Sequence, residues 1–306
     1  MSLPQDKINR LKKTAAVASV CVACSLSLLK VIGALYTGSL AVLSSLIDSL
    51  ADIFASLVTF VAVRFSAQPA DCHHRYGHGK AEALSALVQS AFVAGSGIFV
   101  MYDGFSRLVS PRPLSETNLG IIVMVIALVA TLALIAFQKK VARLTQSTAI
   151  AADSAHYTVD VVTNLSIILT LVVVRWFGLD WFDTLTAFAV SGYLLINAYK
   201  LAARAVAILM DKELGDDIRI NIEKIIMNYP FVRGLHDFRS RDLGGVYMFE
   251  LHLELDGNLP LSQAHHYSNI IDDAIRQAYP SSQVIIHQDP AGLEEDRLDN
   301  RLNCPF

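Results

Sequence analysis

Cysteine and charged residues are both scarce in this sequence of 306 residues. The four cysteines, Cys21, Cys24, Cys72 and Cys304, are scattered along the chain, and their spacing is not that of a disulfide scaffold. Asp, Glu, Lys and Arg make up only 17% of the residues, whereas 53% are hydrophobic. This composition is too apolar for an ordinary soluble protein. The N-terminus also does not read as a cleaved signal peptide, because no small-residue cleavage site follows a short apolar core.

Most of the hydrophobic residues are gathered into six long blocks before residue 210. A helix needs roughly 20 mostly apolar residues to cross the core of a bilayer. Lys and Arg are concentrated in alternate loops, so the positive-inside rule places both termini in the cytoplasm. We therefore predict an α-helical membrane bundle of six transmembrane helices, at Thr14–Leu35, Leu40–Val63, Leu84–Arg107, Leu119–Gln138, Ala149–Phe177 and Phe182–Leu209.

The chain changes character after residue 211, since residues 212–306 carry 16 acidic and 9 basic residues. The apolar residues there recur first with helical and then with strand periodicity. This order predicts a small cytoplasmic α+β domain, α-β-β-α-β, with its helices on one face of a sheet. The expected elements are helices Asp216–Asn228 and Ser262–Tyr279 and strands near Leu235–Arg241, Val246–Leu255 and Gln283–His287. The predicted divisions are 1–211, 212–292 and a C-terminal tail, 293–306.

Ionisable residues occur inside two of the predicted membrane helices. Asp48 and Asp52 are four residues apart in one helix, and His156 and Asp160 are four apart in another. This spacing puts each pair on one helical face. Left unpaired in lipid, three carboxylates and a histidine cost on the order of 10 kcal/mol, and these stretches contain no Lys or Arg to offset them. A bound divalent cation is the partner we expect, although polar residues that merely pin helices together remain an alternative.

Three carboxylate oxygens and one imidazole nitrogen suit Zn²⁺, which accepts a tetrahedron of such ligands. Mg²⁺ or Ca²⁺ would prefer more oxygen ligands and no imidazole, while Fe²⁺, Co²⁺ and Cd²⁺ stay open. Metal binding requires deprotonated ligands, and His156 is the group best suited to exchange a proton for the metal. Metal-for-proton antiport is the resulting hypothesis.

The nine histidines are clustered. Asp71, His74 and His78 in the loop after the second predicted span form a candidate loop metal site, against the alternative of a solvated basic loop. Cys72 and His73 in the same loop are either extra ligands or uninvolved. The acidic domain adds a second group, which could converge on one or two metal ions with Asp289 as a bridge or could be ordinary surface residues: His236, His252, His265, His266, His287 and Asp289.

These motifs together resemble the cation diffusion facilitator family. The resemblance rests on Asp48-x-x-x-Asp52 with His156-x-x-x-Asp160, on the Gln-Pro-Ala-Asp71 to His78-Gly-Lys80 loop, and on the ending Val-Ile-Ile-His287-Gln-Asp289-Pro. It covers nearly the whole chain. It implies a homodimeric zinc/proton antiporter of the bacterial inner membrane, with six spans and a ferredoxin-like cytoplasmic domain. Zn²⁺ is both the implied substrate and a structural or regulatory ion, Cd²⁺ and Fe²⁺ are further candidate substrates, and no nucleic acid is an expected partner.

The resemblance also assigns residues to sites. It implies a transport site of Asp48, Asp52, His156 and Asp160 and a loop site of Asp71, His74 and His78. It implies a binuclear cytoplasmic site of His236, His252, His265, His287 and Asp289, with Gln288 nearby, and a charge interlock between Lys80 and Asp211. Cys72, His73 and His266 depart from the family pattern. The outward direction of transport rests on the resemblance, because a ligand set does not define a direction.

Two other functions are compatible with the same residues. A membrane-bound di-metal enzyme is the first, although no nucleophile or base adjoins the membrane ligands. A metal sensor without transport is the second, in which the acidic domain binds zinc and the membrane aspartates are inert.

Overall fold

The chain forms two compact units, within residues 3–206 and 207–306. The computed structural model describes residues 4–37, 40–109, 118–177, 181–293 and 297–302, and it leaves some helical side chains undescribed, among them that of Asp48.

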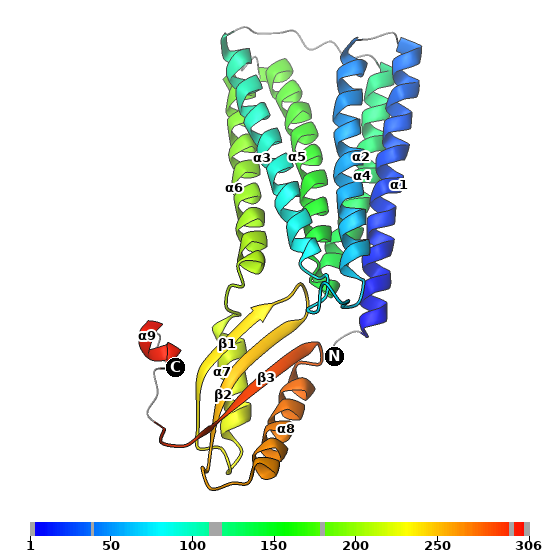
Figure 1. The fold of residues 1–306 in the computed structure, drawn as a ribbon. Coiled ribbons are helices and arrows are strands. Elements are labelled where there is room, and N and C mark those ends of the chain that lie inside the picture. Colours follow the sequence, from blue (N-terminus) through cyan, green and yellow to red (C-terminus); the bar gives the residue numbers. More distant parts are fainter. Residues whose placement is uncertain (1–3, 38–39, 110–117, 178–180, 294–296, 303–306) are drawn as a thin grey trace. The chain divides into compact units, whose positions relative to one another are not determined.

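The first unit is a bundle of long helices (Figure 1). Their lengths of 27 to 33 residues exceed the roughly 20 residues that cross a bilayer core. Within the described residues, three stretches meet both length and hydropathy requirements for a span, namely Asp6–Leu29, Ala81–Ser106 and Leu185–Leu209. The helical membrane fold is thus confirmed, whereas the number of six crossings stays a prediction. The helices are α1 (Gln5–Thr37), α2 (Leu40–Ser66), α3 (Ala81–Val109), α4 (Asn118–Thr145), α5 (Thr148–Phe177) and α6 (Trp181–Leu209).

Small residues lie between these helices, and large apolar residues face outward. Ala15 and Ala16 of α1 are fully buried against α2, α4 and α5 in one cluster. Phe99, Tyr102 and Val129 are exposed. In lipid, close backbone approach at small residues drives helix packing, because apolar side chains gain nothing by leaving the hydrocarbon. This distribution is that of a membrane bundle and the inverse of a soluble core.

A buried ion pair joins the ends of four of these elements. Lys12 of α1 donates to Glu82 at the start of α3 over 2.7 Å, and the two side chains are only 9% and 4% exposed. The Glu82 carboxylate also accepts hydrogen bonds from Ser66 at the end of α2 and from Ser147, next to α5. The salt bridge therefore closes one end of the bundle around a single carboxylate.

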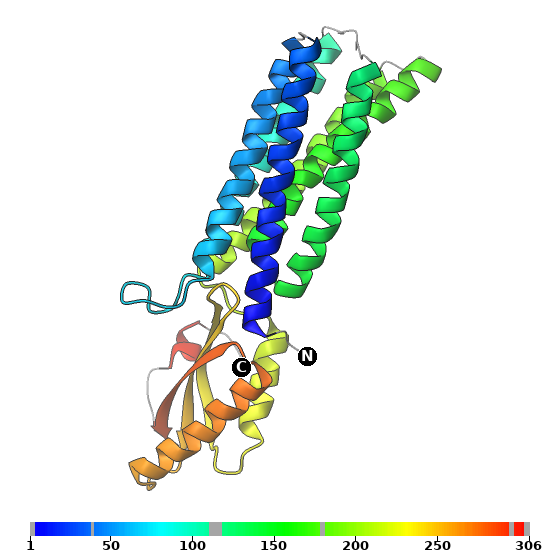
Figure 2. The same cartoon turned by 90° about the vertical axis from the view of Figure 1, so that its right-hand side faces the viewer.

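The second unit is a three-stranded sheet with helices, and it follows the predicted α-β-β-α-β order. The strands run in the order β1-β2-β3, with β1 antiparallel and β3 parallel to β2. Figures 1 and 2 show α7 and α8 on the same face of the sheet, as predicted. A short helix near the C-terminus, α9, was not predicted. The elements are α7 (Asp216–Met227), β1 (Gly234–Asp242), β2 (Tyr247–Leu255), α8 (Leu261–Ala278), β3 (Ser282–Pro290) and α9 (Leu298–Leu302).

The core of this unit lies between the sheet and the two helices. Alternate residues of β2, from Phe249 to Leu255, point into it and are almost fully buried beside Ile271 and Ile275 of α8. Because successive strand residues face opposite sides, His252 and Glu254 point to the other, helix-free face of the sheet. That face carries His236, His252 and His287.

Candidate metal centres

The membrane unit brings together three of the four predicted transport ligands. Asp52 comes from α2, and His156 and Asp160 come from α5 one turn apart. Each offers one ligand atom, and these atoms all lie within 4.8 Å of one another. The His156 Nε2 to Asp52 Oδ1 distance is 3.1 Å. Among the described residues, the buried Nδ1 of His156 has no hydrogen-bond partner. The fourth predicted ligand, Asp48, lies one turn before Asp52 in α2, but its side chain is outside the described residues.

A buried polar network one turn from His156 holds the helices of this cluster together. Ser19 of α1 donates to Asp153 Oδ2 over 2.5 Å, and Gln138 of α4 donates to the same oxygen over 2.6 Å. Tyr157 and Ser56 share a 2.7 Å hydrogen bond between α5 and α2. The helix pair that carries Asp52 and His156 is thus fixed by neighbouring polar contacts. Asp153, one turn before His156 in α5, makes these bonds to α1 and α4.

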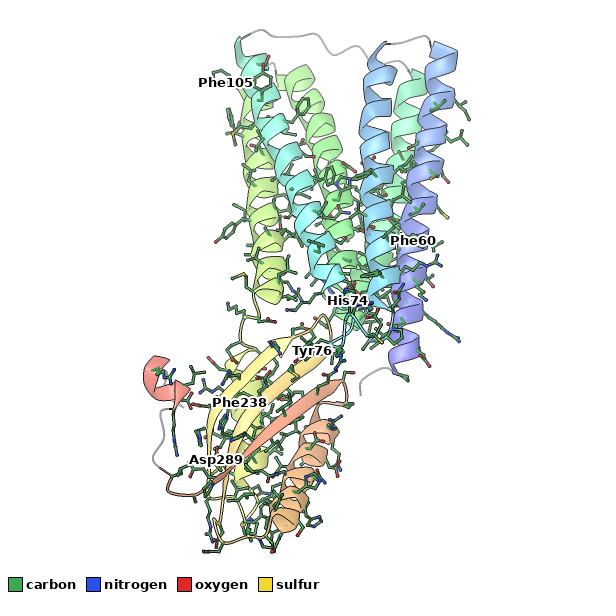
Figure 3. The ribbon with its side chains drawn as sticks, in the orientation of Figure 1. Phe60, His74, Tyr76, Phe105, Phe238 and Asp289 are labelled. Atoms are coloured by element: carbon green, nitrogen blue, oxygen red, sulfur yellow. The ribbon has the colours of Figure 1, made fainter. Side chains whose placement is uncertain are left out.

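The loop between α2 and α3 brings its three predicted ligands together. Asp71 Oδ1 lies 3.3 Å from His74 Nδ1, and Asp71 Oδ2 lies 3.4 Å from His78 Nε2. The three ligand atoms again lie within 4.8 Å of one another. Figure 3 labels His74 in this loop. The side chain of His78 is 2% exposed, whereas those of His74 and Asp71 are about half exposed, so the cluster is anchored by His78 and open to solvent at Asp71.

The backbone of the loop fixes the charge of Asp71. The N–H of His74 donates to Asp71 Oδ1 over 2.6 Å, and the N–H of His73 donates over 2.8 Å. These hydrogen bonds, led by that of His74, hold the pKa of the Asp71 carboxyl below its usual value of 3.8. His73 therefore contributes its backbone N–H to the loop. Neither its imidazole nor Cys72 belongs to the cluster of Asp71, His74 and His78.

A third cluster lies on the helix-free face of the cytoplasmic sheet. Strand pairing aligns His236, His252 and His287 in one row across β1, β2 and β3. Asp289, labelled in Figure 3, follows two residues after His287 on the same face. Its Oδ2 lies 2.8 Å from His252 Nδ1 and 3.6 Å from His236 Nε2, and its Oδ1 lies 3.2 Å from His287 Nε2. Both oxygens of the Asp289 carboxylate are therefore directed at imidazoles, as a bridging ligand requires.

Not every predicted ligand of this site lies in the cluster. The group within 4.8 Å comprises His236, His252 and Asp289, and His287 adjoins it with a side chain that is 65% exposed. His265 is exposed on α8, where its Nε2 lies 3.2 Å from the Nδ2 of Asn269, so its assignment stays a prediction. Gln288 donates to Ser268 of α8 and thus faces the core.

The predicted pairing of Lys80 with Asp211 stays a prediction, because the two residues belong to different units. Within the second unit, Asp211 lies 3.7 Å from Arg241.

The donor sets fit a transition metal. Imidazole nitrogen with carboxylate oxygen, three or four ligands to a cluster, is the combination that suits Zn²⁺. The six to eight oxygens that Ca²⁺ takes are not provided by any of the three described clusters.

The sequence motifs assigned no role to Glu254, which lies beside the cytoplasmic cluster. Glu254 Oε1 lies 3.2 Å from His236 Nδ1. The alternation of β2 placed Glu254 on the polar face with His252, and that was the available signal. Its contact with His236 depends on strand register, which the alternation alone does not define.

The first unit is a membrane bundle with a carboxylate–histidine cluster between its helices, and the second is an α+β domain with a candidate metal-binding cluster. This combination is typical of one class of protein, integral membrane proteins that handle metal cations. Residues 16–210 match the transmembrane domain of cation efflux proteins. Residues 214–291 match the cytoplasmic domain of cation efflux proteins, a domain class associated with dimerisation. The chain belongs to the cation efflux family, which confirms the resemblance drawn from its motifs, and it is a transporter rather than an enzyme.

Two curated relatives agree with this assignment. The cation-efflux pump FieF of Klebsiella pneumoniae subsp. pneumoniae is 44% identical over 285 residues, covering 93% of this chain and 95% of the relative. FieF of Escherichia coli O1:K1 / APEC is 43% identical over the same shares. Among solved structures, the metal-bound C-terminal domain of the CzcD transporter from Thermotoga maritima is 28% identical, covers 26% of this chain and 93% of its own, and has a TM-score of 0.25.

Proposed function

We propose that this chain exports a divalent transition metal, zinc first and Cd²⁺ or Fe²⁺ next, across the bacterial inner membrane in exchange for protons. It works as a homodimer with both termini in the cytoplasm. The observation that carries the proposal is the cluster of Asp52, His156 and Asp160, with ligand atoms within 4.8 Å between two helices of the bundle.

The energetics of this cluster favour a cation as its partner. Two carboxylates converge with a histidine, whose side chain is 6% exposed while that of Asp52 is 21% exposed. Each charged group in the bilayer interior costs roughly 2.5–3.5 kcal/mol on insertion scales. A divalent cation offsets both carboxylates at once, and Asp48 one turn away would complete a tetrahedral set. We infer that these four residues form the transport site.

Proton exchange follows from the chemistry of the ligands. Imidazole and carboxylate bind metal only when deprotonated, so loading the site with metal releases protons and unloading it takes protons up. A site that is exposed to one side of the membrane at a time would couple the two flows. His156 is the group we assign to this exchange, because imidazole changes charge near neutral pH.

The other two clusters are assigned to binding rather than to transport. The row of His236, His252 and His287 with Asp289 has the donors of a binuclear zinc centre, bridged by the two oxygens of Asp289. Metal bound there would stabilise whichever arrangement of the protein assembles the site. The loop cluster of Asp71, His74 and His78 is open to solvent and is proposed as a second zinc site.

Zinc flux into vesicles tests this function. Purified protein is reconstituted into liposomes that contain a zinc-sensitive dye, and zinc is added outside. Asp52→Ala should abolish zinc flux, because it removes a ligand of the transport site. Thr158→Val is the matched control on α5: the Thr158 hydroxyl donates back to the Ser154 carbonyl in the same helix, so flux should remain close to that of the unmodified protein.

A variant of the cytoplasmic cluster separates transport from sensing. His236→Ala should leave flux measurable while weakening its response to zinc concentration. Unmodified protein that carries no zinc flux would contradict the proposal and favour a sensor. Full flux in Asp52→Ala would place the transport site elsewhere.

A further inference from the structure

Glu254 joins the cytoplasmic metal cluster to the C-terminal end of the chain. Its Oε1 lies 3.2 Å from Nδ1 of His236 and accepts a 2.6 Å hydrogen bond from the guanidinium of Arg297. The Glu254 side chain is 14% exposed, and that of Arg297 is 29% exposed. Oε1 of Glu254 thus contacts both His236, a candidate metal ligand, and Arg297, which lies after β3 near the C-terminus.

A glycine makes room for this carboxylate. Gly234 on β1 pairs with Glu254 on β2. A Cβ at position 234 would lie 2.7 Å from Glu254 Oε2 and 2.8 Å from its Cδ, closer than real Cβ contacts come. Any larger residue would push the carboxylate off β1. Gly234 therefore holds open the place from which Glu254 reaches His236.

The segment that carries Arg297 is itself fastened to β1 beside His236. The N–H groups of Leu298 and Asp299 donate to the Asp237 carboxylate, each over 3.0 Å. In return, the N–H of Asp237 donates to Asp299 Oδ2 over 2.8 Å. Asp237 has a φ of 51° at the irregularity in strand pairing that follows His236. A reciprocal pair of carboxylates thus clamps residues 297–299 onto the strand at the metal cluster.

We propose that Glu254 is a positioning residue of the cytoplasmic metal centre, and that the C-terminal segment 297–302 is a clamp that holds Glu254 against His236. In this proposal a proton on His236 Nδ1 faces Glu254 at 3.2 Å, a contact within ion-pair distance but outside hydrogen-bond geometry in this structure. Nε2, which faces Asp289 at 3.6 Å, is left as the metal-binding atom. Carboxylate partners of this kind fix the tautomer and orientation of ligating histidines. The inference rests on the proposed zinc binding by His236, His252 and Asp289.

The role of Arg297 is to hold the carboxylate in place. A glutamate side chain that is not held samples several rotamers, and the conformation in this structure brings Oε1 to 3.2 Å from His236 Nδ1. Arg297 is itself neutralised by Glu254, so the pair adds little net charge beside the metal. Metal binding and docking of segment 297–302 are thermodynamically linked. If docking of the segment strengthens metal binding, metal binding must strengthen docking by the same factor.

Zinc titration of the full chain against a competing chelator tests the proposal. Asp52→Asn and Asp71→Asn are introduced throughout to disable the other two clusters. In this background, Glu254→Gln should weaken zinc binding about 10- to 100-fold, the range found for such partners of ligating residues. Gly234→Ala and Arg297→Gln should weaken it in the same direction, and Arg297→Lys should restore affinity, because the contact to Glu254 needs only one N–H donor.

The matched control is Glu250→Gln. Glu250 lies on the same strand and the same face as Glu254 and is likewise paired with an arginine, Arg241, at 3.1 Å, but the described contacts of its carboxylate include no histidine. Its substitution should leave zinc affinity within about twofold. Equal affinities for the Glu254→Gln and Glu250→Gln variants would overturn the inference while leaving the metal centre intact. A background that binds no zinc would instead overturn the metal centre itself.

Hydrogen exchange supplies a second measurement, whose dependence on zinc would be absent if Glu254 only stabilised the fold. Zinc should slow amide exchange of Leu298 and Asp299 in the unsubstituted background, by the reciprocity of the linkage. That slowing should vanish in Glu254→Gln. Equal exchange with and without zinc in the unsubstituted background would contradict the clamp.

Discussion

Asp71 is an exposed carboxylate whose charge is set by its own loop. Backbone N–H groups of His74 and His73 stabilise the ionised form and keep the pKa of Asp71 below 3.8. The carboxylate therefore stays ionised as the pH falls from 7 to 5. Protonation of Asp71 is therefore not expected to contribute to any loss of metal binding over that range.

This argument predicts how Asp71→Asn behaves with pH. The substitution should weaken zinc binding at the loop site by the same factor at pH 7 and at pH 5, because the wild-type carboxylate is ionised at both. Zinc titrations at the two pH values, in protein carrying Asp52→Asn and His236→Ala to remove the other clusters, measure that factor. A factor that shrinks towards one at pH 5 would contradict this expectation.

At the scale of elements, Glu82 ties the start of α3 to α1, α2 and the start of α5. Its ion pair with Lys12 is nearly excluded from solvent, so breaking the pair leaves a buried charge without its partner. Removal of one partner of a buried pair costs about 3–5 kcal/mol, whereas replacement of both by neutral groups costs far less. The cost of each single substitution therefore exceeds that of the double one.

Thermal unfolding in detergent of Glu82→Gln, Lys12→Met and the double variant checks this expectation. Ser66 and Ser147 donate to different oxygens of Glu82. The introduced glutamine retains one acceptor oxygen, and its amide nitrogen can donate to the other hydroxyl, so the main change is loss of the charge. Each single variant should have a markedly lower unfolding midpoint, and the double variant should recover much of the loss. If the double variant lowers the midpoint by the sum of the two single decreases, the ion pair is not the source of the stability.

The sequence predicted the helices and strands better than it predicted the contacts between them. Spacing of four residues within one helix put His156 and Asp160 on one face, and the short loop made Asp71, His74 and His78 neighbours. That Asp52 meets His156 depends on the packing of α2 against α5, which helical periodicity does not describe. The contact of Glu254 with His236 depends in the same way on strand register, and α9 is too short to leave a periodic signal.

At the scale of the whole molecule, the membrane bundle supplies a partly buried carboxylate–histidine cluster, and the cytoplasmic unit supplies a separate candidate metal-binding cluster on an open sheet face. Membership of the cation efflux family gives the direction that a symmetric ligand set does not. The central claim is that Asp52, His156 and Asp160 bind the transported metal and exchange it for protons.

The most direct test records zinc and proton movement together in the same reconstituted vesicles. Zinc entry should be accompanied by proton exit, an inside-acid gradient should accelerate it, and an inside-alkaline gradient should slow it. Asp160→Asn should lose both movements together, because one site carries both ions. Zinc entry that is indifferent to the pH gradient, or that proceeds without any proton movement, would contradict the account.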